Sequence, residues 1–248
     1  AARAGAGLVT LAVPAELQDV MAVKLTEIMT VGLPGTGEGT LARGARSDIL
    51  ALLERADVLA IGPGLSRHLE TVALVRELLP VLRVPCVIDA DGLNALAGDV
   101  HLWSRISVPV VVTPHEGEMA RLLGRPVEEI RLRRLAVAEE AAAAWGVVVL
   151  LKGAATLIAC PDGTTYINPT GNPGMATGGS GDVLTGVITG LLAQGMSASR
   201  AAAAGAYLHG LAGDMAARAK GMRGLLAGDI LETLPSAIAK VECDCPAW

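Results

Sequence analysis

Short apolar runs alternate along this chain with longer segments in which apolar residues recur at helical spacing. The runs are rich in β-branched residues, and four of them are followed directly by glycine, proline or polar residues; they cover 58–61, 86–88, 108–112 and 147–151. Apolar runs without polar alternation are typical of parallel strands buried on both faces, and the segments between them are typical of covering helices. The pattern predicts an α/β fold, a three-layer α/β/α sandwich with a mostly parallel central sheet.

The helices predicted around these strands differ in length. They cover 47–55 with Ser47 as N-cap, 68–82, a short stretch around Asn94, a helix that ends near Gly124, and a long alanine-rich helix over 128–145. Near the start we expect the end of an alanine-rich helix at 1–6, closed at Gly7, strands at 8–13 and 27–31, and a flexible glycine-rich connection at 32–44. The sequence therefore places its most regular alternation after residue 47.

The pattern changes character after residue 151. Strands at 156–160 and 164–167, separated by Pro161-Asp162-Gly163, are predicted to form a hairpin. A glycine-rich loop then leads into a helix, followed by a second alanine-rich helix over 199–218 and a terminal helix interrupted near Pro235.

Composition and charge narrow the class of protein. Of the 248 residues, 52% are hydrophobic, only 2% are aromatic and none is Phe, so the core must be closely packed Ala, Val and Leu. One domain over 1–248 is expected at this length. The net charge of −5, without a basic cluster, argues against nucleic acid as a partner. Because the sequence shows no apolar run of about eighteen residues and no signal sequence, we expect a cytoplasmic protein with no membrane partner.

The cysteines fit a reducing cytoplasm. They are scattered without a Cys-x-x-Cys pair or companion histidines, a pattern that indicates neither a zinc site nor a disulfide framework; they are Cys86, Cys160, Cys243 and Cys245. The last two lie in the C-terminal tail and are interpreted as incidental.

The segment 172–195 is the strongest candidate for chemistry. Four glycines fall within eight residues and an apolar helix follows them directly; they are Gly174, Gly178, Gly179 and Gly181. Glycine lets a ligand approach the backbone, and a helix N-terminus attracts anions through its free N–H groups and its dipole. The segment predicts a phosphate site. It lacks the Gly-Lys-Ser/Thr of a Walker loop, and Asp182 stands where a hydrolase elbow has its last glycine.

Asp182 lies in the first turn of that helix. A carboxylate beside an anion-binding loop repels phosphate unless it handles a proton or a metal ion. A first-turn Asp is also a common helix-stabilising residue, and position alone leaves both explanations open.

Polar residues follow four of the predicted strands, at 62–66, 89–94, 113–118 and 152–156. Each junction has a local explanation as a turn, a cap or a solvated end. Ligands of doubly wound sheets bind beyond the carboxyl ends of the strands, so all four junctions should lie along one edge beside the glycine loop. His115 is accompanied by two glutamates, but Met119 stands where a zinc helix would have its second His, so a hydrogen-bonding role toward a substrate is favoured.

Five of these motifs occur together in an order that resembles a known family. They are VLAIGPGLS at 58–66, VIDADGLNAL at 87–96, VTPHEGE at 112–118, LKGAAT at 151–156 and the glycine loop at 172–186. The chain is similar to the ADP/ATP-dependent NAD(P)H-hydrate dehydratases, which have a ribokinase-like fold. The resemblance implies repair of (6S)-NADHX and NADPHX, the hydrates of the reduced nicotinamide cofactors, to NADH and NADPH, with ADP favoured over ATP as phosphoryl donor, Mg²⁺ as a cofactor, and a homotetramer.

The resemblance also implies roles for individual residues. Asp182 would be the general base on the substrate hydroxyl. The substrate would contact Gly64, Ser66, His115 and Asp182. The nucleotide would contact Lys152, Gly153, Ala154, Ala155, Thr156, Asn172, Gly179, Ser180 and Gly181. Asp89 and Asn94 would lie near the phosphates and Mg²⁺, with no residue assigned as a metal ligand.

The sequence differs from the family at two places, and two other functions fit the same motifs. Ser66 stands where the family usually has glycine, and the family's first strand with its glycine-rich turn, upstream of 1–7, is absent from this chain. The rivals are a ribokinase-like kinase for a thiazole or pyrimidine alcohol, which would stop at the phosphate ester, and a nucleotide-binding protein without turnover. The motifs at 113–118 and 152–156 favour the dehydratase.

Overall fold

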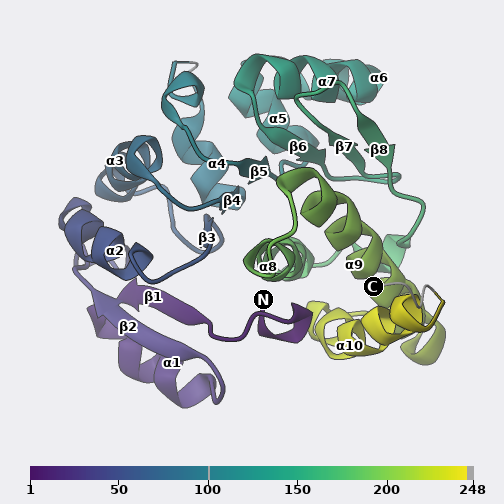
Figure 1. Cartoon of the computed structure of the whole chain (residues 1–248), viewed down its shortest axis with the longest axis horizontal. Helices are drawn as coiled ribbons and strands as arrows, with labels where there is room; N and C mark the ends of the chain where they lie inside the picture. The colour runs from purple at the N-terminus through teal and green to yellow at the C-terminus, as the bar shows by residue number, and fades with distance from the viewer. Residues whose placement is uncertain (100, 245–248) are drawn as a thin grey trace.

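A six-stranded sheet lies at the centre of the computed structural model, which describes residues 1–99 and 101–244. The strands follow one another in chain order across the sheet (Figure 1): β3 Leu59–Ile61, β4 Cys86–Ile88, β5 Val110–Val112, β6 Val148–Leu151, β7 Leu157–Ala159 and β8 Thr165–Ile167. The first four are parallel, and β7 and β8 add two antiparallel pairings, which confirms the predicted hairpin and the mostly parallel sheet.

Helices cover both faces of this sheet. One face carries α2 Arg46–Leu53, α3 Leu69–Leu78, α4 Ala90–Leu96, α5 Glu116–Leu123, α6 Val127–Leu132 and α7 Arg134–Trp145. The other carries α8 Ser180–Ala193, α9 Ala198–Lys220 and α10 Ala227–Asp244. Short 3-10 turns complete the chain: η1 Ala2–Ala4, η2 Ala15–Leu17, η3 Arg43–Ala45, η4 Leu79–Val81, η5 Trp103–Arg105 and η6 Pro173–Met175.

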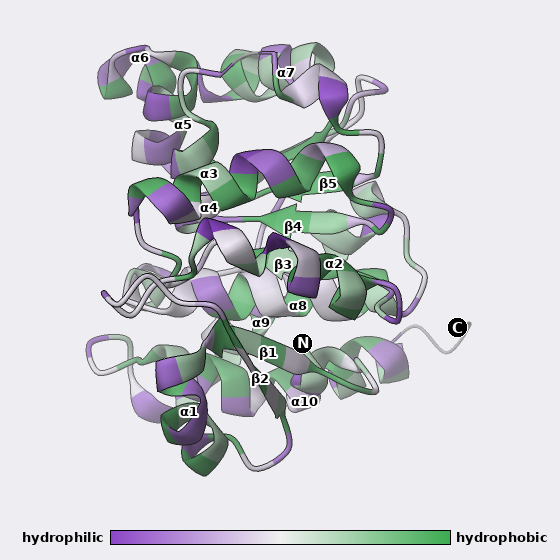
Figure 2. Ribbon diagram, turned by 90° about the vertical axis from the view of Figure 1, so that its left-hand side faces the viewer, coloured by the Kyte–Doolittle hydropathy of each residue, from purple (hydrophilic) through white to green (hydrophobic). Residues whose placement is uncertain are grey.

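The alternation of strand side chains divides the core into two layers. In β4, Cys86 and Ile88 belong to the cluster under α2–α7, and Val87 between them belongs to the cluster under α8–α10. Both sets are fully buried, so the strands are apolar on both faces, as Figure 2 shows for β4 and β5. This confirms the three-layer sandwich predicted from the unbroken apolar runs.

The first segment forms a separate unit of secondary structure. Parallel strands β1 Thr10–Pro14 and β2 Met29–Leu33 make a two-stranded sheet, with α1 Gln18–Lys24 between them in sequence (Figures 1 and 2). The two strands begin two residues later than predicted. The glycine-rich segment after β2 is partly ordered by a bridge between Gly35 and Leu41 and by the burial of Leu41, so the expected flexible connection is wrong there.

Several predicted helix boundaries are wrong. The N-terminal turn is a 3-10 helix that ends at Gly5, and α2 begins at Arg46 with Ala45 as N-cap, so Ser47 lies inside the helix. The alanine-rich helix is two helices, because the backbone leaves helical geometry at Arg133 where Arg134 turns toward the 151–154 backbone. The terminal helix continues through Pro235, since the buried face formed by Ile230, Leu234 and Ala237 packs on both sides of the proline.

Candidate active site

The four polar junctions converge at the carboxyl ends of β3 to β6, as predicted. The backbone N–H of Ser66 donates to Asp91 at 3.1 Å, and Arg121 donates to the Asn94 amide oxygen at 2.9 Å. Lys152 then links the last junction to the second, because its ammonium donates to Asp89 at 2.7 Å. The polar residues that follow adjacent strands therefore form one connected site.

Gly62 lets the first two junctions pack closely. Its φ is +135°, and a Cβ placed on it would lie 1.7 Å from the Asp89 carbonyl oxygen. Gly92, on the facing helix, has the same restriction, because its Cβ would lie 2.9 Å from the Ile61 carbonyl oxygen. The Gly-Pro-Gly turn thus rests against the backbone that presents Asp89.

Asp89 is the buried centre of the site. Its residue is 1% exposed, one carboxylate oxygen accepts from Lys152 at 2.7 Å, and the other accepts from the Thr185 hydroxyl at 2.8 Å. The Asp89 side chain makes no capping hydrogen bond to α4, and Lys152 is not a solvated strand end. The local explanations for these two residues are therefore wrong, and a buried ion pair joins β4, β6 and α8.

Glu118 extends this charged group toward β5. It is 6% exposed, and one of its oxygens lies 3.7 Å from the Lys152 ammonium and accepts from the His115 backbone N–H at 2.8 Å. His115 caps α5: its Nδ1 accepts from the N–H groups of Gly117 at 2.9 Å and of Glu118 at 3.3 Å. His115 is held by the helix start, its ring is half exposed, and its contact with substrate stays a prediction.

The start of α8 meets this group directly. Gly179, its N-cap, has φ +85° and no side-chain cap. The Ser180 N–H donates to the Thr177 carbonyl at 3.3 Å, which leaves the N–H groups of Gly181 and Asp182 without a capping side chain. A Cβ on Gly181 would lie 3.4 Å from the Lys152 ammonium and 3.7 Å from Asp89. The positive end of the α8 dipole and the Lys152 ammonium therefore lie next to each other. Together they form an arrangement that attracts a phosphate group.

Asp182 follows in the same turn and is exposed. Desolvation, the largest cause, raises the pKa of its carboxyl group; the charge of Asp89 raises it further, and Lys152 opposes the rise. A raised pKa makes the ionised carboxylate a better proton acceptor, which is the property a general base needs.

Ser180, a predicted nucleotide contact, has a structural partner on α9. It is buried, and its hydroxyl lies 3.4 Å from Nε2 of His209 on α9. Asn172 likewise has a structural partner: its amide donates to Asp214 on α9 at 2.9 Å, and its oxygen accepts from the Gly174 N–H. Both side chains fasten the glycine loop to α9, and the Ser180 N–H donates to the Thr177 carbonyl at 3.3 Å. The nucleotide contacts of Ser180 and Asn172 stay predictions.

Replacing His209 should change how stability depends on pH. Burial, the largest cause, lowers the pKa of His209 to about 4; a hydrogen bond to the Ser180 backbone opposes the drop, and the Lys152 charge adds to it. Below its ordinary pKa of about 6.5 the unfolded chain takes up a proton that the folded chain refuses, so the free energy of unfolding falls on the order of 3 kcal/mol between pH 6.5 and 4. In His209→Asn this part of the slope should disappear.

Urea denaturation across this pH range measures the effect. The exposed His101→Gln variant is the matched control and should keep the parental slope. An unchanged slope in His209→Asn would show that His209 titrates as freely as an exposed histidine.

The 152–156 segment is held in an unusual backbone conformation. Gly153 has φ +152° and Ala155 has φ +52°, while the Thr156 hydroxyl donates to the Gly153 carbonyl at 3.1 Å. Gly153, Ala154 and Ala155 are exposed. The predicted nucleotide contacts in this segment are therefore accessible, and their roles stay predictions.

Ser66 has a left-handed backbone, with φ +71°. This geometry gives a physical reason for glycine at the position, because a Cβ costs roughly 1–2 kcal/mol there. Gly64, also at positive φ, has open space where a Cβ would point. Both positions border the exposed side of the turn.

Ser66→Gly should leave stability unchanged or raise it by up to about 1 kcal/mol, because relief of the left-handed strain exceeds the extra chain entropy of glycine. Ser66→Val should lower stability by more than about 1 kcal/mol, since β-branched residues tolerate positive φ poorly. Thermal unfolding of both variants measures the pair. A destabilised Ser66→Gly variant would mean that the side chain makes a stabilising contact.

Three partners of the site were not predicted from the sequence. Thr185 and His209 lie in apolar helices, and Arg134 begins an alanine-rich helix; each contacts a residue far away in the chain. The sequence signal that could have found them is a polar residue within an apolar or alanine-rich helix. It is clearest at His209 and Asp214 in α9.

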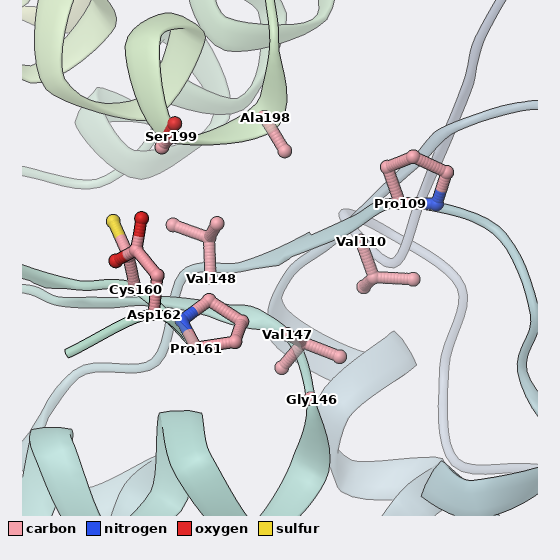
Figure 3. A pocket seen from close by; sticks show the side chains of 10 residues that line it. All are labelled: Pro109, Val110, Gly146, Val147, Val148, Cys160, Pro161, Asp162, Ala198 and Ser199. Atoms are coloured by element: carbon pink, nitrogen blue, oxygen red, sulfur yellow. The ribbon is translucent and has the colours of Figure 1, made fainter. Parts of the chain in front are cut away.

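Two hollows lie at opposite ends of the sheet. One of about 450 Å³ adjoins the glycine loop and is lined by residues of 173–177 and 222–226. The other, of about 260 Å³, lies where β5 and β6 begin; Figure 3 shows Ala198 and Ser199 on one side and Cys160 and Asp162 across from them. Only the first is beside the candidate site.

Metal and membrane features were searched over residues 1–99 and 101–244. Among them no group of three or more His, Cys, Asp or Glu side chains is placed to hold a metal ion. The oxygens of Asp89 and Asn94 already accept hydrogen bonds. Over the same part of the chain, no helix combines the length and apolarity needed to cross a membrane. Cys86 and Cys160 are buried and free, Cys243 is exposed, and Cys245 lies outside the described residues.

Comparison with known proteins places this geometry in context. A family profile described as NAD(P)H-hydrate dehydratase matches residues 1–236. The bifunctional NAD(P)H-hydrate repair enzyme of Moorella thermoacetica is 57% identical over 98% of this chain and 46% of its own length. The ADP-dependent (S)-NAD(P)H-hydrate dehydratase of Xanthomonas campestris is 35% identical over 97% of this chain and 81% of its own. The chain therefore spans about half the length of the bifunctional relative.

Solved structures agree with the sequence matches. The ADP/ATP-dependent NAD(P)H-hydrate dehydratase of Bacillus subtilis, co-crystallised with ATP/Mg²⁺, has a TM-score of 0.81 at 30% identity, covering 97% of this chain and 81% of that one. Ribokinase of Thermotoga maritima shares the fold alone, with a TM-score of 0.56 at 16% identity over 94% of this chain and 80% of its own. The ribokinase-like fold predicted from the motifs is confirmed.

Proposed function

The chain belongs to the NAD(P)H-hydrate dehydratase family, and on that premise we propose that it dehydrates (6S)-NADHX and NADPHX to NADH and NADPH at the expense of a nucleotide. The observation that carries this proposal is the meeting of the uncapped α8 start, the Lys152 ammonium and the exposed carboxylate of Asp182 within one turn of helix. A phosphoryl group and a hydroxyl acceptor are the two ligands that such a site fits.

The reaction divides into two steps at these residues. Hydroxide is a poor leaving group, so transfer of a phosphoryl group to the substrate hydroxyl comes first, and Asp182 takes the hydroxyl proton. N–H groups of Gly179 and Gly181 and the Lys152 charge stabilise the negative charge spread over the transferred group. Phosphate then leaves from the ring carbon, the ring nitrogen supplies the electron pair, and loss of the neighbouring C–H proton completes the double bond.

The nucleotide would lie between the exposed 152–156 backbone and the glycine loop, with the 450 Å³ hollow beside that loop large enough for part of it. A Mg²⁺ ion accompanying it would be held mainly by phosphate oxygens and water, and would neutralise phosphate charge. Gly64, Ser66 and His115 border the same edge and would contact the hydrate. The ADP-dependent relative supports ADP as the donor.

We also propose a single domain over 1–248 that assembles as a homotetramer in the cytoplasm. Support for association comes from exposed apolar side chains on and around α1, β1 and β2; they are Leu8, Val20, Val23 and Met29. Support for a reducing compartment comes from the free thiols of Cys86, Cys160 and Cys243.

The proposal is tested by mixing purified protein with NADHX and with ADP, with ATP, or with neither, while the absorbance of reduced nicotinamide is followed. Recovery that requires a nucleotide is the expected result, faster with ADP. No recovery with either nucleotide would contradict the repair function.

A further inference from the structure

We propose that Arg134 is a positioning residue that fixes the backbone of the 152–156 segment and thereby prepares two amide groups for the nucleotide. This inference rests on the proposed nucleotide-dependent function for its consequence, although the arrangement itself is independent of any ligand. Arg134 lies at the start of α7, outside the motifs that identified the site.

The guanidinium of Arg134 donates to three carbonyl groups of the 151–154 backbone. Its Nη1 donates to Ala154 at 2.6 Å, and its Nη2 donates to Leu151 at 3.3 Å and to Lys152 at 3.5 Å. A planar fork of donors on a charged group suits such a cluster of acceptors better than the single ammonium of lysine. Arg134 thus determines which way these peptide groups point.

The backbone conformation of the 152–156 segment needs stabilising contacts such as those from Arg134. Gly153 and Ala155 both have positive φ, a conformation that Ala adopts only at a cost. A Cβ on Gly153 would lie 2.6 Å from Nη2 of Arg134, so the glycine is required for the guanidinium to approach. The unusual backbone and the arginine therefore belong to one arrangement.

The orientation of these carbonyl groups also fixes the direction of the N–H group in the same peptide. In a trans peptide the C=O and N–H point in opposite directions. Because the carbonyls of Lys152 and Ala154 face Arg134, the N–H groups of Gly153 and Ala155 face away from it, on exposed residues. The Lys152 N–H is used by the Pro114 carbonyl at 2.8 Å. Two outward donors remain beside Lys152, whose ammonium reaches the start of α8.

The carboxylate of Glu116 balances the positive charge of Arg134. Its Nε is buried without a hydrogen-bond partner, and the nearest carboxylate oxygen, on Glu116, lies 3.6 Å away. Arg131 donates to the other oxygen of Glu116 at 2.8 Å, but its side chain is 61% exposed, and among the described residues it makes no hydrogen bond or ion pair with the 152–156 segment. Arg131 therefore provides a matched control that disturbs the same glutamate without touching the 152–156 backbone.

The first measurement uses ligand-free protein. Amide hydrogen exchange over 151–157 should be faster in Arg134→Met than in the parent, and Arg131→Met should match the parent. Equal exchange in Arg134→Met and the parent would overturn the proposal, whatever the enzyme does with nucleotides. Arg134→Lys and Arg134→Gln, which keep fewer N–H donors than the guanidinium, allow the same comparison if Arg134→Met does not fold.

The second measurement is calorimetric binding of ADP, together with KM for ADP and for NADPHX. We expect the ADP dissociation constant to rise about tenfold or more in Arg134→Met, equivalent to losing one hydrogen bond, and less in Arg134→Lys, while KM for NADPHX stays within about twofold. A parallel loss for both ligands would mean a general structural defect and would overturn the positioning role. Absence of ADP binding by the parent, with altered exchange in the variant, would instead count against the proposed function.

Discussion

Asp182→Asn is expected to lower kcat for hydrate dehydration by at least about a hundredfold, the contribution typical of a general base. The amide is nearly the same size but accepts no proton, so the phosphoryl transfer loses its acceptor for the hydroxyl proton. ADP affinity should stay the same or improve slightly, because a negative charge beside the phosphate site is removed. Steady-state kinetics combined with calorimetric ADP binding measures both effects.

The control for Asp182 is another acidic residue in the first turn of a helix. Asp48 is exposed in the first turn of α2, a helix that supplies none of the candidate site residues. Asp48→Asn should show the small stability loss typical of first-turn acids, a few tenths of a kcal/mol up to about 1, and unchanged kcat. If Asp182→Asn behaved like Asp48→Asn, the carboxylate would only stabilise its helix.

Lys152→Met is expected to destabilise the protein by about 3–5 kcal/mol, because it leaves the Asp89 carboxylate buried without its cation. Thr185 alone continues to donate to Asp89, and a single neutral hydroxyl cannot compensate a buried charge. Urea denaturation at neutral pH measures this loss.

The double variant Asp89→Asn/Lys152→Met separates the buried charge from lost packing. It should recover most of the stability lost in Lys152→Met, because neither member is then a buried unpaired ion. Lys220→Met, which breaks an exposed pair with Asp229, should cost no more than about 1 kcal/mol. A Lys152→Met variant as stable as Lys220→Met would contradict the buried position of Asp89.

The sheet and the site edge could be predicted because both depend on local sequence. Strands buried on both faces require unbroken apolar runs, and parallel strands bring their carboxyl ends to one edge, so the sequence located the junctions of Asp89 and Lys152 correctly. Helix α1 was not predicted because none of its residues is buried, and a helix without a buried face has no apolar periodicity to detect.

The parts of the site that were not predicted from the sequence depend on contacts between residues far apart in the chain. Thr185 reaches Asp89 across 96 positions, and His209 reaches Ser180 across 29. No spacing rule within a single chain segment predicts such pairs. The same cause explains the break at Arg133 and the continuous helix through Pro235, where tertiary packing outweighs local propensity.

The most direct test of the central claim is the phosphorus balance of the reaction. Phosphorus NMR of a mixture of protein, NADPHX and ADP should show one inorganic phosphate and one AMP formed for every NADPH, with no stable hydrate phosphorylated on its ring hydroxyl. Accumulation of the hydrate phosphorylated on its ring hydroxyl, without NADPH, would identify a kinase that stops at phosphoryl transfer and would contradict this account.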